Sequence, residues 1–510
     1  MIQYISILAS PSQTFVDRIG MYRIVSGTLG ILATISIFCG FVGWLPYSGF
    51  EQLQALIPAL IWALLLNHFT ATASKISGSP ESTFITTLIL FFLVVPGESF
   101  LDNWPLFVAV TTAIMSKYVL VYRKQHFLNP AAVGAVAVSL PGFYVFSWWI
   151  GNPTLFIPLL LLGILVVMKI RKWTPVLWFV GVGLATYIFE AIRFGDALLP
   201  ATQTFFLSWP TLFLAFFMLT EPFTMPPRKW QQAGYGALVG FLSNTALFIP
   251  FFAMSPELAL IIGNILVAPL RLSQKLFLQL EEKKLIAKDT YEFVFKKPKG
   301  FTFVVGQYLE WMLPHEKYDN KGTRRYFTIA SSPTESQIRV ALKITEQPSS
   351  YKAALQRLDS GGVVVASQLA GDFVLPKDTS AKLGFIAGGI GVTPFRSHVR
   401  HMVDSGKTHD TVLYYCNNTK DEIAYGGMFS DAAKKFPFSL INVISKESVA
   451  VPFESGYVTA DMIRRRSPDY LERTWYISGP PGMVNAYKKL LLGVGVSRSH
   501  IKTDFFPGTV

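Results

Sequence analysis

The chain has 510 residues, of which 51% are hydrophobic and only 15% are charged, and its mean hydropathy is +0.39. These values exclude an ordinary water-soluble protein of this size and place a large part of the chain in lipid. The net charge of +13 raises the question of nucleic-acid binding, but the 12 Lys and Arg of residues 1–270 are accompanied by 9 Asp and Glu, and most of these basic residues lie in short loops outside the helices, so we expect no nucleic-acid partner.

Cysteine and histidine usage limits the cofactors that this chain can ligate. Cys39 and Cys416 are too few for the four thiolates of an iron–sulfur cluster, and they give no disulfide framework. The seven histidines and the scattered carboxylates show no metal-ligand spacing, so we expect no metal site. The first residues, MIQYISILASPSQTFVDR, lack the basic start and the cleavage site of a signal peptide, so we expect no cleaved signal there.

Apolar stretches of about 20 residues, the length that crosses a bilayer, recur along the first half of the chain. They predict a polytopic α-helical membrane bundle of about ten transmembrane helices in a domain over residues 1–271. The predicted helix cores are residues 24–45, 52–72, 83–97, 103–121, 131–149, 153–168, 174–190, 204–220, 233–250 and 255–270.

Positive residues mark every second loop between these helices. Short cytoplasmic loops retain Lys and Arg, so this alternation predicts a multi-pass protein of the cytoplasmic (inner) membrane with both termini in the cytosol. The intervening loops contain one basic residue, Arg193. The basic loops carry Arg18 and Arg23, Lys75, Arg123 and Lys124, Lys169, Arg171 and Lys172, Arg228 and Lys229, and Arg271 and Lys275.

Two motifs distinguish the membrane half from a generic helix bundle. His126-Phe-Leu-Asn129-Pro130-Ala-Ala opens the fifth helix, where a proline at the helix start is sterically allowed. Phe216-Phe-Met-Leu-Thr220-Glu221-Pro222 puts a carboxylate at the cytoplasmic end of the eighth helix. In this order the motifs resemble those of the flavin-carrying membrane subunits of the sodium-pumping NADH:quinone reductase and of the Rnf complex, over roughly residues 20–270.

The same resemblance implies a covalent flavin. In that family a threonine of an extracytosolic loop carries FMN through a phosphoester, within a motif resembling Asp-x-x-[Ser/Thr]-[Ser/Gly]-Ala-Thr. Asp196-Ala-Leu-Leu-Pro-Ala-Thr202 has the matching Asp, Ala and Thr, whereas Leu199 and Pro200 replace small residues. Thr202 is therefore either covalently flavinylated by an FMN transferase or an ordinary loop threonine that caps the eighth helix.

From Gln279 onwards the pattern changes to short alternating runs broken by Gly and Pro, such as Tyr291-Glu-Phe-Val-Phe and Gly306-Gln-Tyr-Leu-Glu-Trp. This periodicity is typical of β-strands and predicts a small β-barrel flavin domain over residues 272–380.

Within that domain Arg324-Arg-Tyr-Phe-Thr-Ile-Ala-Ser-Ser-Pro resembles the Arg-x-Tyr-[Ser/Thr] flavin motif of the ferredoxin–NADP+ reductase superfamily. The resemblance implies that Arg325 binds the FAD diphosphate, that Phe327 packs beside the isoalloxazine, and that Thr328 bonds its N5 edge and is catalytic. The family tyrosine is Phe327 here. Ser349 and Ser350 fit the family's second phosphate-binding turn before a helix, although a simple serine cap explains them equally well.

A nucleotide-binding pattern follows. The predicted strand Leu383-Gly-Phe-Ile-Ala runs into a glycine-rich loop and an expected helix, which indicates an NAD(P)-binding α/β domain over residues 381–510. Glycines let the backbone approach a pyrophosphate, and a helix N-terminus stabilises its charge. The loop residues expected to bind NADH or NADPH are Gly388, Gly389, Gly391, Thr393 and Pro394.

Two later segments complete the superfamily resemblance. Ser478-Gly479-Pro480-Pro-Gly-Met483 resembles the Cys-Gly-Pro-x-x-Met turn beneath the nicotinamide, with Ser478 in place of the cysteine. Phe506 stands where relatives place an aromatic ring near the flavin, so Ser478 and Phe506 join Thr328 as expected catalytic residues. After Tyr414-Tyr415 no arginine is positioned for a 2′-phosphate and two acids follow, which favours NADH over NADPH.

Joining the halves requires an intermediate carrier, because a hydrocarbon layer of about 30 Å separates a cytosolic flavin from Thr202. The membrane half has only His68 and His126, too few for a haem pair. What remains is a second, non-covalent flavin, FMN or riboflavin, which we place near Asn129. The predicted function is electron transfer from cytosolic NAD(P)H through FAD and membrane flavins to an extracytosolic acceptor. The alternatives are an NAD(P)H:quinone reductase without transmembrane transfer, and a flavin-binding or flavin-transport module tethered to a flavin reductase.

Overall fold

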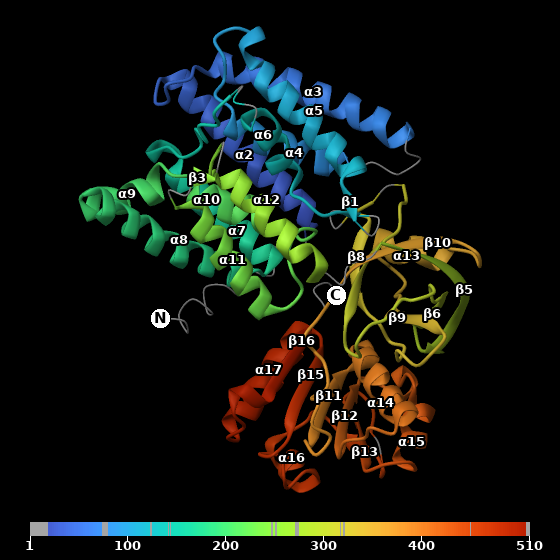
Figure 1. Cartoon of the computed structure of the whole chain (residues 1–510). Helices are drawn as coiled ribbons and strands as arrows, with labels where there is room; N and C mark the ends of the chain where they lie inside the picture. The colour runs from blue at the N-terminus through green and yellow to red at the C-terminus, as the bar shows by residue number, and fades with distance from the viewer. Residues whose placement is uncertain are drawn as a thin grey trace. The chain divides into compact units, whose positions relative to one another are not determined.

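The computed structural model describes residues 19–73, 80–122, 125–140, 142, 144–245, 248–249, 252–270, 275–316, 318–319, 322–448 and 450–505. The chain divides into two compact units, Met1–Gln274 and Lys275–Val510. Figure 1 draws the first unit in blue to green and the second in yellow to red.

The N-terminal unit is built from helices. Those long and apolar enough to cross a membrane, among the described residues, are α2 (Met21–Val42), α3 (Gly49–Ala73), α7 with the 3-10 turn before it (Pro153–Ile170), and α8 (Trp173–Phe194). The bent pair Leu198–Leu207 and Thr211–Met218 makes a fifth if it forms one span. The remaining helices are α4 (Pro80–Leu93), α5 (Trp104–Val119), α6 (Pro130–Ser139), α11 (Lys229–Ser243) and α12 (Pro256–Val267).

Two predicted helices are wrong in their second halves. The helix expected over 131–149 is α6, which ends at Ser139, because Pro141 cannot continue the hydrogen-bond ladder and Gly142 adopts a positive φ of 77°. The helix expected over 233–250 is α11, which ends at Ser243. There the side chain of Asn244 donates to Gly240 O at 2.8 Å, and the two-residue strands β3 (Phe248–Ile249) and β4 (Phe252–Ala253) follow.

The eighth predicted helix, 204–220, is broken rather than continuous. Its first part, α9 (Leu198–Leu207), and its second part, α10 (Thr211–Phe213) with the π-helical turn Leu214–Met218, meet at 46°. Pro210 lacks the N–H that a continuous helix needs at that point. Thr202 therefore lies inside a helix and not in a loop, which corrects the prediction.

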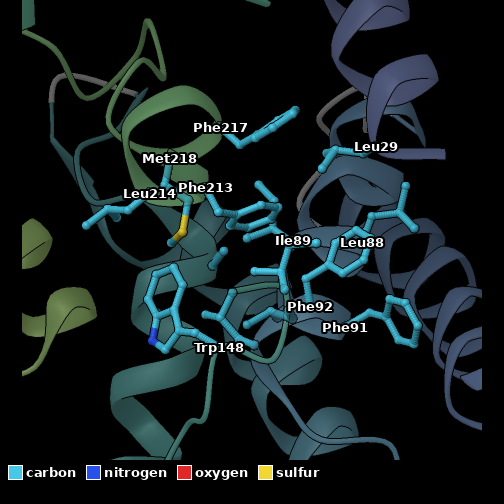
Figure 2. Packing of buried hydrophobic residues seen from close by; sticks show 14 of the residues in the cluster. Leu29, Leu88, Ile89, Phe91, Phe92, Trp148, Phe213, Leu214, Phe217 and Met218 are labelled. Carbon is cyan, nitrogen blue, oxygen red and sulfur yellow. The ribbon is translucent and has the colours of Figure 1, made fainter. Parts of the chain in front are cut away.

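The core of the N-terminal unit gathers around that broken helix. Figure 2 shows Phe213, Phe217 and Met218 facing Ile89, Phe92 and Trp148. The rings of Phe213 and Phe217 stack with centroids 5.2 Å apart, and Phe213 meets Phe92 edge-on at 5.6 Å. All of these side chains are at least nine-tenths buried. The break is thus held by aromatic packing, which fixes the segment that follows it, Thr220 to Pro222.

The C-terminal unit begins with a six-stranded antiparallel sheet in the order β8-β7-β10-β5-β6-β9. The alternating runs of the sequence form β6 and β7, as expected. A short helix, α13 (Ser350–Arg357), follows β9, and the buried side chain of Tyr351 packs it into the core of the sheet. The strands are β5 (Leu276–Ala287), β6 (Thr290–Lys296), β7 (Tyr308–Met312), β8 (Arg324–Thr328), β9 (Gln337–Lys343) and β10 (Val363–Ala370).

A second, parallel sheet follows in the order β14-β13-β12-β11-β15-β16. Its central strand β11 (Leu383–Gly388) is buried along its whole length, as a strand covered on both faces should be. Helices α14 (Thr393–Ser405) and α15 (Gly426–Ala433) cover one face, and α16 (Ala460–Arg466) and α17 (Pro481–Gly493) cover the other (Figure 1). The other strands are β12 (Thr411–Asn417), β13 (Phe438–Ile444), β14 (Glu454–Ser455), β15 (Thr474–Gly479) and β16 (Ile501–Phe505).

Candidate functional site

The flavin motif forms β8, where Arg325 lies at the centre of an ionic cluster. Its guanidinium donates to both carboxylate oxygens of Asp319, at 3.0 and 3.2 Å, and to the carbonyl of Gly322 at 2.8 Å. The backbone N–H of Ser350, at the start of α13, donates to the same carboxylate at 3.1 Å. A guanidinium and a helix N-terminus therefore converge on one anion, as the resemblance implies for Arg325 and Ser350.

The Asp319 carboxylate occupies the position that a phosphate would take between these donors. Arginine pairs bidentately with phosphates as it does with carboxylates, and the first turn of a helix favours either anion. Ser349 caps α13 by accepting from Lys352 N at 3.5 Å, so its side chain serves the helix start. The donor set fits a diphosphate, provided that the Asp319 side chain moves away.

Next to this cluster lie side chains suited to a flavin ring. The Thr328 hydroxyl is buried and has no hydrogen-bond partner in the described part of the chain. Phe327 packs against the Tyr351 ring with centroids 5.8 Å apart. The Tyr351 hydroxyl is likewise buried and unpartnered among the described residues, and burial raises its pKa above the ordinary value, so it stays a donor. Both hydroxyls are buried polar groups without a partner among the described residues, which makes them candidates to bond a ligand.

The glycine-rich loop follows β11, the strand at which the strand order of the parallel sheet reverses. Strand β11 pairs with β12 on one side and with β15 on the other, so the chain leaves β11 in one direction and later returns to its opposite side. In doubly wound sheets, nucleotides bind at the carboxyl ends of the strands at such a switch point. The register pairs Ala387 with Ser478, which brings the loop after β11 beside the turn after β15.

These two segments touch closely, and only glycine allows it. A Cβ on Gly391 would lie 2.6 Å from Ser478 O and 2.7 Å from Gly479 Cα, and a Cβ on Gly388 would lie 2.3 Å from the Met483 sulfur. Gly389 has a φ of +51° and open space where a side chain would stand. The sequence motifs of both segments thus meet at the carboxyl edge of the sheet, where Gly389 is partly exposed and leaves room for a pyrophosphate.

Helix α14 begins at this edge of the sheet. Thr393 and Pro394 form its first positions, and no side chain caps its N-terminus. The Ser478 hydroxyl is fully buried and has no partner within the described residues, and Pro480 is exposed at the rim. The structure therefore brings together the predicted nucleotide-binding residues on β11, α14 and β15.

Contacts between α14 and the segment after β8 join the flavin motif to this edge of the sheet. Arg396 donates to Ala330 O at 3.1 Å, and the Ser397 hydroxyl donates to Ser331 O at 2.7 Å. Burial lowers the pKa of His398 to about 3, so its neutral ring shares a 3.0 Å hydrogen bond with Phe373 O. The carboxyl end of β8, which carries Thr328, is therefore fixed against the helix that follows the glycine-rich loop.

The two acids after β12 do not support the expected preference for NADH. Asp421 pairs with Lys288 at 3.3 Å, and Glu422 pairs with Lys343 at 2.7 Å. Both lysines belong to the first sheet or to its turns. The acids join the two sheets, which removes the argument for NADH that depended on them.

A second candidate site lies in the N-terminal unit, where the two membrane motifs meet. A pocket of about 640 Å³, including the solvent at its mouth, is lined by residues of both motifs. From the first motif come His126, Asn129 and Pro130, and from the second Thr220, Glu221 and Pro222. Figure 2 shows Phe217, another lining residue, on the broken helix. His126 Nε2 lies 3.0 Å from Glu221 Oε1.

Asn129 makes hydrogen bonds that fix the helices around this pocket. Its side chain accepts from Ala132 N at 3.1 Å as the N-cap of α6 and donates to Met218 O at 3.2 Å. Its own N–H donates to Asn264 Oδ1 at 2.8 Å, and Asn264 in turn reaches the Tyr235 hydroxyl. Asn129 thus positions three helices around the pocket.

Two other expected site residues stand apart. Thr202 lies on α9, where its hydroxyl donates to Leu198 O at 2.8 Å within its own helix. Phe506 lies outside the described residues, and the strand before it, β16, pairs Phe505 with Gly479 at the end of β15. The described residues contain no group of three or more His, Cys, Asp or Glu that could hold a metal ion.

Sequence reasoning missed Asp319, Tyr351 and the polar residues of α4 that line the pocket, Ser82 and Thr86. Tyr351 follows Ser350 directly, so its place on the first turn of the predicted helix was a usable signal. Nothing in the sequence pattern distinguishes Asp319 or Ser82 from other surface positions.

A known protein family matches the part of the chain that contains the glycine-rich loop and the turn after β15. Residues 385–489 match the family model of the oxidoreductase NAD-binding domain. The C-terminal unit carries a ferredoxin–NADP+ reductase-like FAD/NAD-binding domain. Homologues of this unit are NAD(P)H-dependent oxidoreductases.

Three curated relatives show the same kind of unit. The reductase component of propane 2-monooxygenase from Rhodococcus jostii is 28% identical over 41% of this chain and 57% of its own length. The glycine betaine monooxygenase reductase subunit of Chromohalobacter salexigens is 26% identical over 43% and 60%. The plasma membrane-associated coenzyme Q6 reductase of Saccharomyces cerevisiae is 29% identical over 41% and 68%. The chain thus spans less than two thirds of the two monooxygenase reductases.

Among solved structures, the Amycolatopsis cytochrome P450 reductase GcoB aligns with a TM-score of 0.42 and 22% identity, covering 46% of this chain and 71% of that one. The resemblance of the N-terminal unit to flavin-carrying membrane subunits stays a prediction.

Proposed function

We propose that this protein moves electrons from cytosolic NAD(P)H through FAD in its C-terminal unit into flavins of its N-terminal unit, and from there to an acceptor on the far side of the membrane. FAD, when bound, accepts a hydride and releases electrons one at a time, which suits a junction between a nicotinamide and a membrane chain. In the proposal, the sheet β8-β7-β10-β5-β6-β9 is the predicted flavin barrel.

The residues of this chain would bind the two cofactors, orient them and shield them from water. Arg325 and the Ser350 N–H would hold the diphosphate, and the unpartnered hydroxyls of Thr328 and Tyr351 would bond the ring edge. Gly389 would let the nicotinamide nucleotide approach its backbone, while Gly388 and Gly391 let the loop pack against Met483 and Ser478. Ser478, fully buried, would border the nicotinamide, where proximity and exclusion of water favour transfer.

One observation carries this function most directly. The segment directly after β8 is hydrogen-bonded to α14 through Arg396 and Ser397, so the flavin motif is attached to the helix that follows the glycine-rich loop. Hydride transfer requires two rings in contact, and effective molarities of about 10⁵ M or more follow from such fixed geometry.

The pocket around Asn129 supports the membrane part of the proposal. Two motifs about 90 residues apart in the sequence supply its walls, and both are the motifs that resemble flavin-carrying subunits. We place the non-covalent flavin, riboflavin or FMN, in this pocket. The finer topology, with about ten spans and both termini in the cytosol, belongs to the same proposal and depends on the hydropathy pattern and the alternation of basic loops in the sequence. Among the described residues, four helices, or five with the bent pair, are long and apolar enough to cross a membrane.

A quinone reductase without transmembrane transfer is the second candidate function. One relative is called a plasma membrane-associated coenzyme Q6 reductase, and a quinone in the membrane is a chemically suitable acceptor. The third candidate, a flavin-transport module tethered to a reductase, would move flavin without NADH. Only the leading function requires a second redox site on the far face.

Covalent FMN on Thr202 is the proposed far-side site. The wild-type protein, made together with an FMN transferase, is expected to show flavin fluorescence in a denaturing gel, and Thr202→Ala is expected to abolish it. Thr204→Ala on the same helix is the matched control and should keep the signal. Because Thr202 lies in α9, the transferase must unwind that helix to reach it. Equal fluorescence in Thr202→Ala and in wild type would remove the assignment.

Asp319 is expected to compete with FAD for its donors. Replacing it by alanine frees Arg325 and the Ser350 N–H, so the apoprotein of Asp319→Ala should bind FAD more tightly, by about threefold to tenfold. A fluorescence titration with FAD measures this. Asp359→Ala, an exposed acid of the same sheet domain, should leave the affinity unchanged. Weaker FAD binding in Asp319→Ala would show that Asp319 supports the site instead of filling it.

A further inference from the structure

A lysine lies directly behind one wall of the pocket in the N-terminal unit. Lys117, on α5, donates from Nζ to Ser82 O and Ser82 Oγ, both at 3.1 Å, and to Thr86 Oγ1 at 2.8 Å. Ser82 and Thr86 belong to α4 and line the pocket. The three ammonium hydrogens are therefore all directed at the pocket wall.

The charge of Lys117 is not neutralised by a direct ion pair within the described residues, because its three recorded partners are neutral oxygens. Glu221, on the opposite motif, attracts it electrostatically but makes its close contact with His126, at 3.0 Å. A lysine among apolar helices is costly, and such residues usually face a ligand pathway or a polar cavity. A purely structural role would be met as well by a neutral donor between α4 and α5.

We propose that Lys117 makes this pocket selective for a flavin ring in its reduced, negatively charged form. The inference deepens the proposed function and depends on a flavin in the pocket. NAD(P)H supplies two electrons and one proton, and a neutral flavin that receives all three carries one negative charge. A fixed positive charge behind the pocket wall would stabilise that form over the oxidised one, because the charge is already oriented and lies in a medium of low dielectric constant.

Lys117 acts in this arrangement as a positioning residue. It places its charge through Ser82 and Thr86, whose oxygens stand between the ammonium and the pocket. Electrons would therefore be drawn from the FAD of the reductase unit into the membrane unit and held there until the next acceptor takes them. The ligand class that fits is a ring that is neutral when oxidised and anionic when reduced.

The test compares how tightly the full-length protein in detergent binds riboflavin in its oxidised and its chemically reduced state. Equilibrium dialysis, with riboflavin and FAD separated by chromatography, gives both affinities without optical overlap. In Lys117→Met the affinity for reduced riboflavin should fall at least about tenfold more than the affinity for oxidised riboflavin. Such a tenfold change corresponds to about 30 mV in the potential of a two-electron couple.

Two further variants keep the test decisive. Lys117→Arg retains the charge and should restore the preference for reduced riboflavin, whereas Thr112→Val, on the same helix and with its hydroxyl donating to Val108 O, should behave as wild type. Equal losses of both affinities in Lys117→Met would show a structural lysine and overturn this inference alone. A wild-type protein that binds no riboflavin in either state would overturn the flavin pocket itself, and this inference with it.

Discussion

Replacing Arg325 by methionine is expected to remove FAD from the protein and to abolish NAD(P)H oxidation. Methionine has a similar length but no donor, so the convergent pair formed by the guanidinium and the Ser350 N–H is lost. Two charge-assisted hydrogen bonds of about 1.5–3 kcal/mol each predict at least about 100-fold weaker FAD binding. The flavin content of the purified protein and a titration with FAD measure the effect.

The neighbouring arginine is a matched control. Arg324 precedes Arg325 on β8, so its side chain points to the other face of the strand, where it pairs with Glu310 at 2.7 Å. Arg324→Met should lose that ion pair and keep FAD. An Arg325→Met protein with a full complement of FAD would show that the anion site between Arg325 and α13 does not bind the cofactor.

Replacing Asn129 by leucine is expected to separate the two activities of the chain. The substitution removes the cap of α6 and the donor to Met218 O, so the wall between the two membrane motifs loses its fixed geometry. NAD(P)H oxidation by a soluble artificial acceptor should stay at the wild-type rate, because that reaction needs only the C-terminal unit. Delivery of electrons to the membrane unit should fall at least about tenfold, in line with a lost buried hydrogen bond and cap.

The control for stability is another helix cap in the same unit. Asn152 caps the 3-10 turn before α7 by accepting from Thr154 N at 2.9 Å, and it does not line the pocket. Asn152→Leu should cost about 1 kcal/mol of stability and leave electron delivery intact. If Asn129→Leu and Asn152→Leu behaved alike, the pocket would have no part in the route.

Much of the C-terminal unit could be predicted because its motifs report local backbone geometry. Glycines such as Gly391 are needed where an added Cβ would lie within 3 Å of another backbone segment, here the turn after β15. The cap at Ser349 was predicted for a similar reason, as one of the two alternatives for that turn. The pairing of Arg325 with Asp319 was not, because it joins a loop to a strand through side chains whose spacing in the sequence has no fixed meaning.

The N-terminal unit was predicted less well, since hydropathy measures apolar length and not helix continuity. Residues 140–149 and 244–253 are apolar enough for a span, yet α6 and α11 end before them. A proline at 210 gave a local signal for the break in the eighth helix. The meeting of Asn129 with Glu221 in one pocket follows from tertiary packing, for which the order of motifs in the chain was the only sequence signal.

Transmembrane electron transfer is the central claim, and sealed vesicles test it most directly. Vesicles that expose the reductase unit outside and enclose an impermeant acceptor would receive NADH, which cannot cross the bilayer. We expect the enclosed acceptor to be reduced at a rate that requires Thr202 and Asn129. Oxidation of NADH that reduces only acceptors outside the vesicle or quinone in the bilayer, with the enclosed acceptor unchanged, would contradict the account.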